Sequence, residues 1–85
     1  MRERNVTVSL KDGLDARGIA MCVQTASRFR SGIYLKDGVR RMNAKSIMGM
    51  MALGLALGDQ ITVAAEGKDE EAAVDAMAAF LEGAA

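Results

Sequence analysis

The order and spacing of the apolar residues predict an α+β fold, in which three helices cover one face of a four-stranded antiparallel sheet. Four segments are patterned as strands with one buried face, and three others have apolar residues at the three- and four-residue spacing of amphipathic helices. Their order is strand, helix, strand, strand, helix, strand, helix. With only 85 residues, 51% of them hydrophobic, residues 1–85 are expected to form a single domain.

The first strand is predicted at residues 6–10, where Val6, Val8 and Leu10 face inward and Lys11-Asp12-Gly13 ends the strand. A helix then fits residues 16–29, with Asp15 at its N-cap position. Its apolar stripe consists of Ile19, Cys22, Val23, Ala26 and Phe29.

Two short strands, 33–35 and 39–42, are predicted to form a hairpin around Asp37-Gly38, a pair that tolerates a positive φ. A second helix is expected from Ile47 to about Leu53, with Ser46 as its cap and Gly54 as its stop.

The last strand is predicted at residues 60–66, and a final helix follows it. Ile61, Val63 and Ala65 share one face of that strand. The acidic residues Asp69, Glu70 and Glu71 gather at the positive end of the helix dipole. The buried face of this helix is expected to consist of Ala73, Val74, Met77, Phe80 and Leu81.

The chain contains no histidine, which excludes a Ser-His triad, a histidine metal ligand and a phosphohistidine. Cys22 is its one cysteine, so an intramolecular disulfide and a thiolate zinc site are also excluded, and a reducing compartment fits. The longest apolar stretch, residues 47–57, is too short to span about 30 Å of hydrocarbon. No signal-peptide core follows the N-terminus. We therefore expect a soluble, cytoplasmic protein with no membrane partner.

Charge is distributed unevenly along a chain whose net charge is zero. Residues 1–45 hold ten of the eleven basic residues and four acids, giving +6, whereas residues 46–85 hold one base and seven acids, giving −6. Either a basic face meets an anionic partner, or the two halves pair across the fold. Direct nucleic-acid binding is not expected, because the cationic side chains lack interleaved aromatics and a groove-reading motif. These side chains are Arg28, Arg30, Arg40 and Arg41.

Two helix starts carry the candidate functional residues. Asp15 and Arg17 lie where an anion would be favoured, although the pattern alone favours Asp15 as a capping carboxylate. Gly18 is unusual there, because glycine in a helical turn costs up to about 1 kcal/mol relative to alanine. Ser46 follows Lys45 at the second helix start, where a phosphate would be stabilised, although an unmodified cap is the simpler interpretation.

The second helix is rich in methionine and too short to bury every side. Met50 is expected in the core with Leu53, whereas Ile47 and Met51 remain exposed, and flexible thioethers suit an adaptable binding patch. The alternative is that all four apolar residues fill an irregular core. No phosphate loop, metal cluster or pair of catalytic carboxylates is found, so the sequence predicts no enzyme, no cofactor and no metal.

Residues 13–20 (GLDARGIA) and 43–49 (NAKSIMG) resemble two motifs of the HPr family of bacterial phosphotransferase-system phosphocarriers. The resemblance covers nearly the whole chain and implies an open-faced β-sandwich. In that family a histidine in the first motif accepts a phosphoryl group from enzyme I and passes it to IIA domains, and the neighbouring arginine stabilises the phosphate. Here Asp15 stands in the place of the histidine and Gly18 in the place of the usual proline, while Arg17 is kept. Acting as a phosphohistidine carrier is therefore not expected.

The chain lacks the histidine but keeps the motif around Ser46, and in this it is similar to the Crh branch of the family. That branch carries another residue at the histidine position. The resemblance implies that an HPr kinase/phosphorylase modifies Ser46 and that a LacI-type transcription regulator binds the product in carbon catabolite control. Arg17 would then pair with the phosphate or with a partner group. The implied contact residues beside Asp15, Arg17 and Ser46 are Ala20, Met21, Gln24, Ile47, Met48 and Met51.

Two alternatives remain open from the sequence. In the first, Asp15 carries phosphate as an acyl phosphate in a variant phosphocarrier of sugar transport that meets enzyme I or IIA domains. In the second, the domain is an accessory module of an unrelated pathway.

Overall fold

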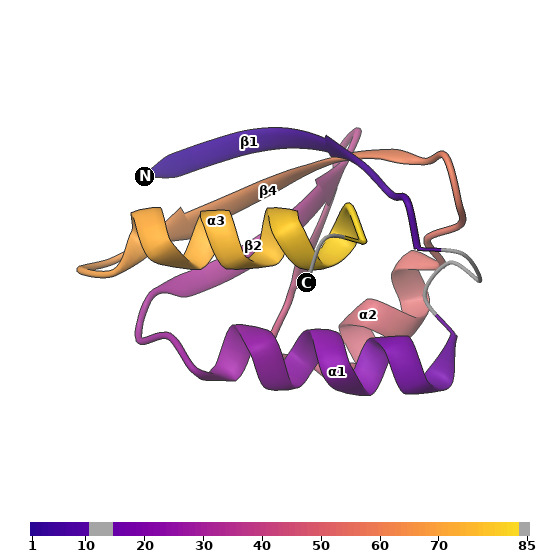
Figure 1. Ribbon diagram of the computed structural model, residues 1–85, viewed down its shortest axis with the longest axis horizontal. Coiled ribbons are helices and arrows are strands. Elements are labelled where there is room, and N and C mark those ends of the chain that lie inside the picture. The colour runs from indigo at the N-terminus through magenta and orange to yellow at the C-terminus, as the bar shows by residue number, and fades with distance from the viewer. Residues whose placement is uncertain (11–14, 84–85) are drawn as a thin grey trace.

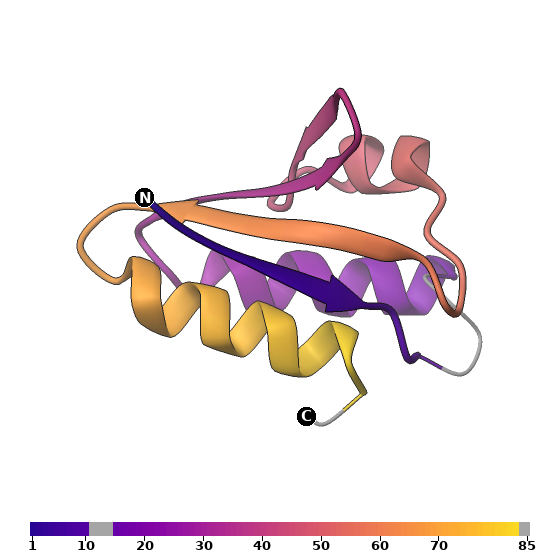
Figure 2. The same ribbon diagram turned by 90° about the horizontal axis from the view of Figure 1, so that it is seen from above.

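The computed structural model describes residues 1–10 and 15–83, and its strands form one antiparallel sheet in the order β1-β4-β2-β3. Seven elements follow one another along the chain: β1 (Arg2–Thr7), α1 (Ala16–Ser27), β2 (Gly32–Asp37), β3 (Arg40–Asn43), α2 (Ile47–Leu53), β4 (Gln60–Glu66) and α3 (Glu70–Leu81). All three helices lie on the same side of the sheet (Figures 1 and 2). The predicted α+β class and element order are confirmed.

The core fills the space between the sheet and the helices, because alternate residues of the strands turn their side chains toward the helical layer. Leu35 pairs with Val63 of β4, and Val6 pairs with Ile61. All four side chains are buried, and Cys22, Met50 and Met77 close over them from the three helices. Val23, Phe29 and Phe80, predicted as core residues, are only partly buried at its margin.

Strand β1 was predicted too late in the sequence, since it spans Arg2–Thr7 and not residues 6–10. Its first half is polar, and Arg2 and Arg4 form ion pairs with acidic residues of α3. Arg4 Nη2 lies 2.7 Å from Asp75 Oδ1. Val8 is buried but has left the sheet, and its N–H donates to the Asp59 carbonyl at 2.8 Å. Leu10 is half-buried, and the predicted stop at residues 11–13 lies outside the described residues.

The predicted hairpin is present, but its turn lies one residue later. Asp37 pairs with Arg40, which leaves Gly38 and Val39 as the central residues, and Gly38 has the positive φ of 62°. Helix α1 ends at Ser27, two residues before its predicted end. At this end of the helix the backbone hydrogen bonds join residues three positions apart instead of four, such as Phe29 N–H to the Ala26 carbonyl at 3.2 Å.

Asp69 occupies the N-cap position of α3 but makes no capping hydrogen bond with its side chain. Its carboxylate reaches across to the loop after α1, where it accepts hydrogen bonds from the N–H groups of Arg30 and Ser31, each at 2.9 Å, and from the Ser31 hydroxyl. These bonds, the serine hydroxyl first, lower the pKa of Asp69 from 3.8 to about 2. Glu70 and Glu71 do lie in the first turn of α3.

The two charged halves of the chain pair in part across the fold. Arg2 and Arg4 of β1 contact Glu71 and Asp75 of α3, and the N-terminal ammonium lies 3.3 Å from Glu70. Within residues 1–10 and 15–83, the remaining ion pairs of β2 and β3 join residues of the first half, and none involves a cation of α1. Among the described residues, the ion pairs between the two halves therefore join the N-terminal segment to α3.

Candidate functional site

Ser46 caps the first turn of α2, as predicted. Its backbone is extended, and its Oγ accepts a hydrogen bond from Gly49 N–H at 3.1 Å. The approach to the helix is held by Asn43, whose carbonyl accepts Ser46 N–H at 3.0 Å and whose side chain accepts Lys45 N–H at 2.8 Å. Gly54 ends the helix with φ of 63°. The hydroxyl is therefore half-buried and held at a defined position.

Lys45 has a role that the sequence did not reveal. Its Nζ donates to the Phe29 carbonyl at 2.7 Å, just beyond the end of α1. A cation at this position satisfies a carbonyl that has no partner within the helix. The contact ties the start of α2 to the end of α1, and it joins residues 16 positions apart in the sequence, where no local pattern could predict it.

Asp15 caps α1, which confirms the structural interpretation of this residue. Its Oδ1 accepts Gly18 N–H at 2.7 Å, and its carbonyl accepts Ile19 N–H at 2.8 Å. Asp15 and Arg17 are exposed, and Gly18 is half-buried. The first two residues of the motif, Gly13 and Leu14, lie outside the described residues.

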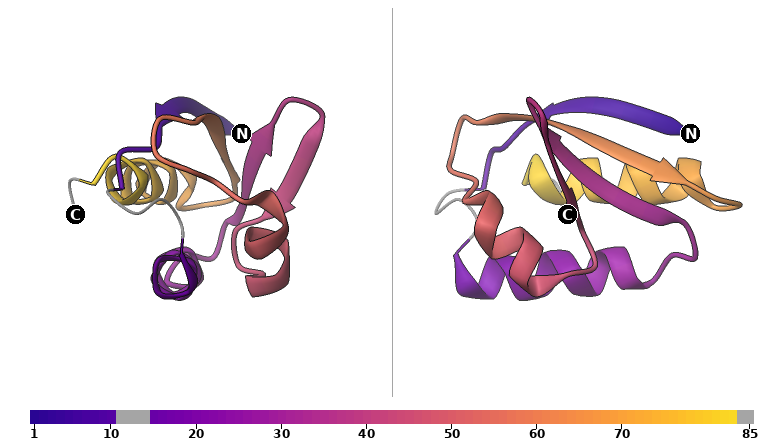
Figure 3. Two further views of the ribbon diagram at one scale, coloured as in Figure 1. Left: turned by 90° about the vertical axis from the view of Figure 1, so that its right-hand side faces the viewer. Right: turned by 180° about the vertical axis from the view of Figure 1, so that it is seen from behind.

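The two helices run in roughly opposite directions. α1 and α2 lie side by side, and α2 begins alongside the middle of α1 (Figures 1 and 3), where the Lys45 side chain reaches the Phe29 carbonyl. Arg17 lies in the first turn of α1, about 15 Å along the helix axis from Ser27, the last residue of the helix, at ~1.5 Å per residue. In the unmodified protein, none of the hydrogen bonds between described residues joins Arg17 to Ser46. Pairing of Arg17 with a phosphate on Ser46 stays a prediction.

An apolar patch, defined here as Met21, Ile47, Met48 and Met51, is exposed on the same two helices. The exposed fractions are 47% for Met21, 52% for Ile47, 82% for Met48 and 62% for Met51. The interpretation that all four apolar residues of α2 fill the core is wrong, because only Met50, together with Leu53, is buried. Ala20 and Gln24, the other predicted contact residues, are also exposed.

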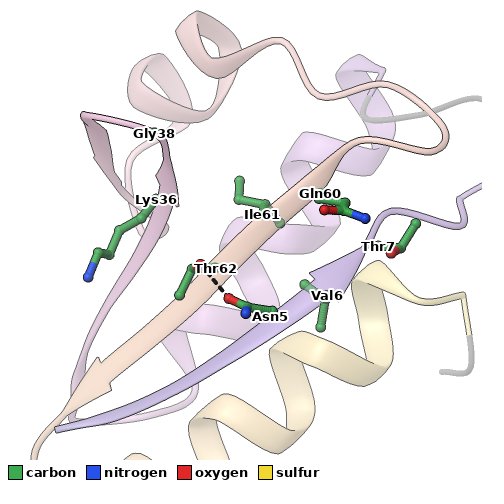
Figure 4. A pocket seen from close by; sticks show the side chains of 8 residues that line it. All are labelled: Asn5, Val6, Thr7, Lys36, Gly38, Gln60, Ile61 and Thr62. Carbon is green, nitrogen blue, oxygen red and sulfur yellow. Dashed lines mark hydrogen bonds between the residues drawn. The ribbon is translucent and has the colours of Figure 1, made fainter.

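A hollow of about 310 Å³ lies away from these residues, on the sheet (Figure 4). Its lining is mainly polar, and Thr62 Oγ1 donates to Asn5 Oδ1 at 2.7 Å. None of the candidate residues lines it. Over residues 1–10 and 15–83, no group of three or more acidic or cysteine side chains could hold a metal ion, and no helix could span a membrane. The lining residues are Asn5, Val6, Thr7, Lys36, Gly38, Gln60, Ile61 and Thr62.

Comparison with known proteins agrees with this geometry. The family model described as "PTS HPr component phosphorylation site" matches residues 2–83. The HPr-like protein Crh of Halalkalibacterium halodurans is 48% identical over 82 residues, which are 96% of this chain and 98% of that protein. The phosphocarrier protein HPr of Xylella fastidiosa is 44% identical over 96% of this chain and 92% of its own. The crystal structure of HPr-C-His from Thermoanaerobacter tengcongensis superposes with a TM-score of 0.92 at 43% identity, covering 99% of this chain and 94% of that one.

The fold and the two capped helix starts thus define a small open-faced β-sandwich of the phosphocarrier type. The chain belongs to the HPr family. Curated proteins named Crh and a protein named as a phosphocarrier match it at similar identity, so the identities alone do not separate the two kinds of member.

Proposed function

We propose that this protein is a non-enzymatic regulatory member of the HPr family, switched by phosphorylation of Ser46. In this proposal, an HPr kinase/phosphorylase phosphorylates Ser46. A LacI-type transcription regulator, called the reader below, binds the phosphorylated protein in carbon catabolite control. One observation carries the proposal: the serine segment forms an ordered cap beside an exposed apolar patch, in a chain that has no histidine.

Phosphorylation would change the charge and the hydrogen-bonding groups at the start of α2. A phosphoserine carries up to about two negative charges and three strong acceptor oxygens. One of those oxygens can take over Gly49 N–H, which Ser46 Oγ accepts at 3.1 Å in the unmodified protein. The others remain available to the arginine side chains of a partner. Lys45 donates one N–H to the Phe29 carbonyl at 2.7 Å, and the other two N–H groups of its ammonium are available to a phosphate or to solvent.

The apolar patch gives the same partner a second kind of contact. Ile47 and Met48 follow Ser46 directly, and Met51 lies one turn further along α2. A reader with a cationic group beside an apolar pocket would bind charge and hydrophobic surface together. Adaptable thioethers fit such a surface, because methionine repacks easily against different partners. On α1, exposed Arg17 is available to an acidic group of that reader.

Asp15 argues against a carrier role. A phosphohistidine needs an imidazole nitrogen, and Asp15 offers only a carboxylate, one oxygen of which is bound to Gly18 N–H. An acyl phosphate on Asp15 remains the competing function, because the carboxylate is exposed and Arg17 lies two residues away. In that case, Asp15 would receive the phosphoryl group from enzyme I.

The kinase reaction separates these functions. The wild-type protein, Ser46→Ala and Asp15→Asn are incubated with an HPr kinase and ATP, and their intact masses are measured. We expect the mass of one phosphoryl group on the wild-type protein and on Asp15→Asn, and none on Ser46→Ala. Ser27→Ala, which removes an exposed hydroxyl at the end of α1, is the matched control and should be modified fully.

A second incubation, with enzyme I and its phosphoryl donor, tests the competing function. A hydroxylamine-labile label that disappears in Asp15→Asn would establish the acyl phosphate. An unmodified wild-type protein in the kinase reaction would refute the switch at Ser46.

A further inference from the structure

The methionines differ widely in their exposure. Of the seven in the chain, Met50 and Met77 are fully buried and Met42 is partly buried at the margin of the core. Met21, Met48 and Met51 are the exposed thioethers of the apolar patch, and Met1 at the N-terminus is exposed as well. Oxidation of methionine depends on access of the oxidant to the sulfur, so the exposed and the buried methionines should react at different rates.

The two most exposed thioethers of the patch share one face of α2. Met48 and Met51 are three residues apart, and Ile47 is four residues from Met51, which places all three side chains on neighbouring positions of the helix surface. Met48 is the second residue of the helix that Ser46 caps. A chemical change at either sulfur therefore alters the surface directly beside the proposed phosphorylation site.

We infer that Met48 and Met51 are oxidation sites for hydroperoxides, and that their sulfoxides block docking of the reader even when Ser46 is phosphorylated. The docking half of this inference rests on the proposed function. In the reaction the thioether sulfur attacks the terminal oxygen of the hydroperoxide. The O–O bond breaks as the S–O bond forms, and sulfur gives up two electrons. The proton of the terminal oxygen passes to the departing oxygen, so the peroxide leaves as an alcohol, or as water when hydrogen peroxide is the oxidant.

The sulfoxide changes docking because it makes a polar group out of an apolar one. Its oxygen is a strong hydrogen-bond acceptor, and an interface that has evolved to cover a thioether offers it no donor. Burial of a polar group without a partner is unfavourable. The phosphate on Ser46 is untouched by this chemistry, so oxidation and phosphorylation act on one surface in opposite directions.

The first test is the order of oxidation. The protein is treated with hydrogen peroxide for increasing times and mapped by peptide mass spectrometry. We expect Met48 and Met51 to convert early, together with exposed Met1 and Met21, and at least ~10-fold faster than Met50 and Met77, whose sulfurs react only when the structure opens. The far-ultraviolet circular dichroism should not change, since Met48 and Met51 lie outside the core. Equal rates at exposed and buried positions would overturn the assignment.

The second test is binding. The protein phosphorylated at Ser46 is titrated into a LacI-type regulator before and after oxidation, beside the double variant Met48→Leu/Met51→Leu, which keeps the apolar volume without sulfur. Oxidation should weaken binding of the wild-type protein on the order of tenfold and weaken binding of the variant much less, since the variant keeps only Met21 of the exposed thioethers of the apolar patch. Equal affinity of the oxidised and reduced wild-type protein would overturn the inference. Failure of the reduced, phosphorylated protein to bind would refute the proposed function itself, together with the docking half, while the oxidation order is decided separately by the peptide map.

Discussion

The variant Ser46→Ala tests whether the Ser46 hydroxyl caps α2. In Ser46→Ala the hydrogen bond between Oγ and Gly49 N–H, 3.1 Å long, is lost, and the first turn of α2 keeps an unpaired donor. Loss of such a cap costs about 1 kcal/mol. The unfolding entropy is ~2.1 cal/mol/K per residue, so for 85 residues this cost lowers the melting temperature by about 6 °C.

Thermal unfolding followed by circular dichroism measures this shift. Ser27→Ala is the matched control, because it removes an exposed hydroxyl at the last residue of α1, and its melting temperature should stay within about 3 °C of the wild-type value, equivalent to ~0.5 kcal/mol. The phosphorylated wild-type protein should melt no lower than the unmodified protein, since a phosphoryl oxygen can accept Gly49 N–H. A Ser46→Ala variant as stable as Ser27→Ala would refute the assignment of the cap.

Four further predictions concern the loop that Asp69 binds, the first turn of α2 and the core. Asp69 has its pKa lowered to about 2 in the folded protein from 3.8, so its contribution to stability is full above about pH 4 and is lost as the pH falls through 2. The urea midpoint of the wild-type protein should fall over that window, and that of Asp69→Asn should fall less. Gly67→Ala should melt below the wild-type protein, because its Cβ would lie 2.6 Å from Ser31 Oγ at a φ of 151°. Gly49→Ala, whose Cβ comes no closer than 3.4 Å to a neighbour, should melt higher, because alanine is favoured in a helix by up to ~1 kcal/mol. The thiol of Cys22 is fully buried and burial raises its pKa to about 12, so a thiol reagent at neutral pH should label it only as urea unfolds the protein; rapid labelling of the native protein would contradict this burial.

Local patterns predicted most of the fold because most of its elements are specified locally. Ser46 and Gly54 bound α2 at the predicted residues, since a capping hydroxyl and a left-handed glycine act within one turn of the helix. The alternation of apolar and polar residues did not predict the first half of β1, because that half is stabilised by ion pairs to α3 and by pairing with β4. Arg4, for example, faces Val63 in the sheet and Asp75 in the helix. Such partners become neighbours only once the chain has folded.

The candidate site was predictable to the same extent. Exposure of Ile47 and Met51 follows from the shortness of α2, which cannot bury every side, and the structure confirms it. The role of Lys45 could not be predicted, because the Phe29 carbonyl it binds belongs to another helix end. The partners of Asp69, 38 and 39 residues away, are equally non-local. An acidic residue at a helix start predicts a cap, and only the tertiary structure shows that this carboxylate holds a distant loop.

The measurement that addresses the central claim most directly is the affinity of a LacI-type regulator for the protein with and without phosphate on Ser46. Isothermal titration of the two forms gives both dissociation constants under one set of conditions. We expect the phosphorylated form to bind at least ~10-fold more tightly, since charge-assisted hydrogen bonds contribute ~1.5–3 kcal/mol each. Equal affinities for the two forms would contradict it.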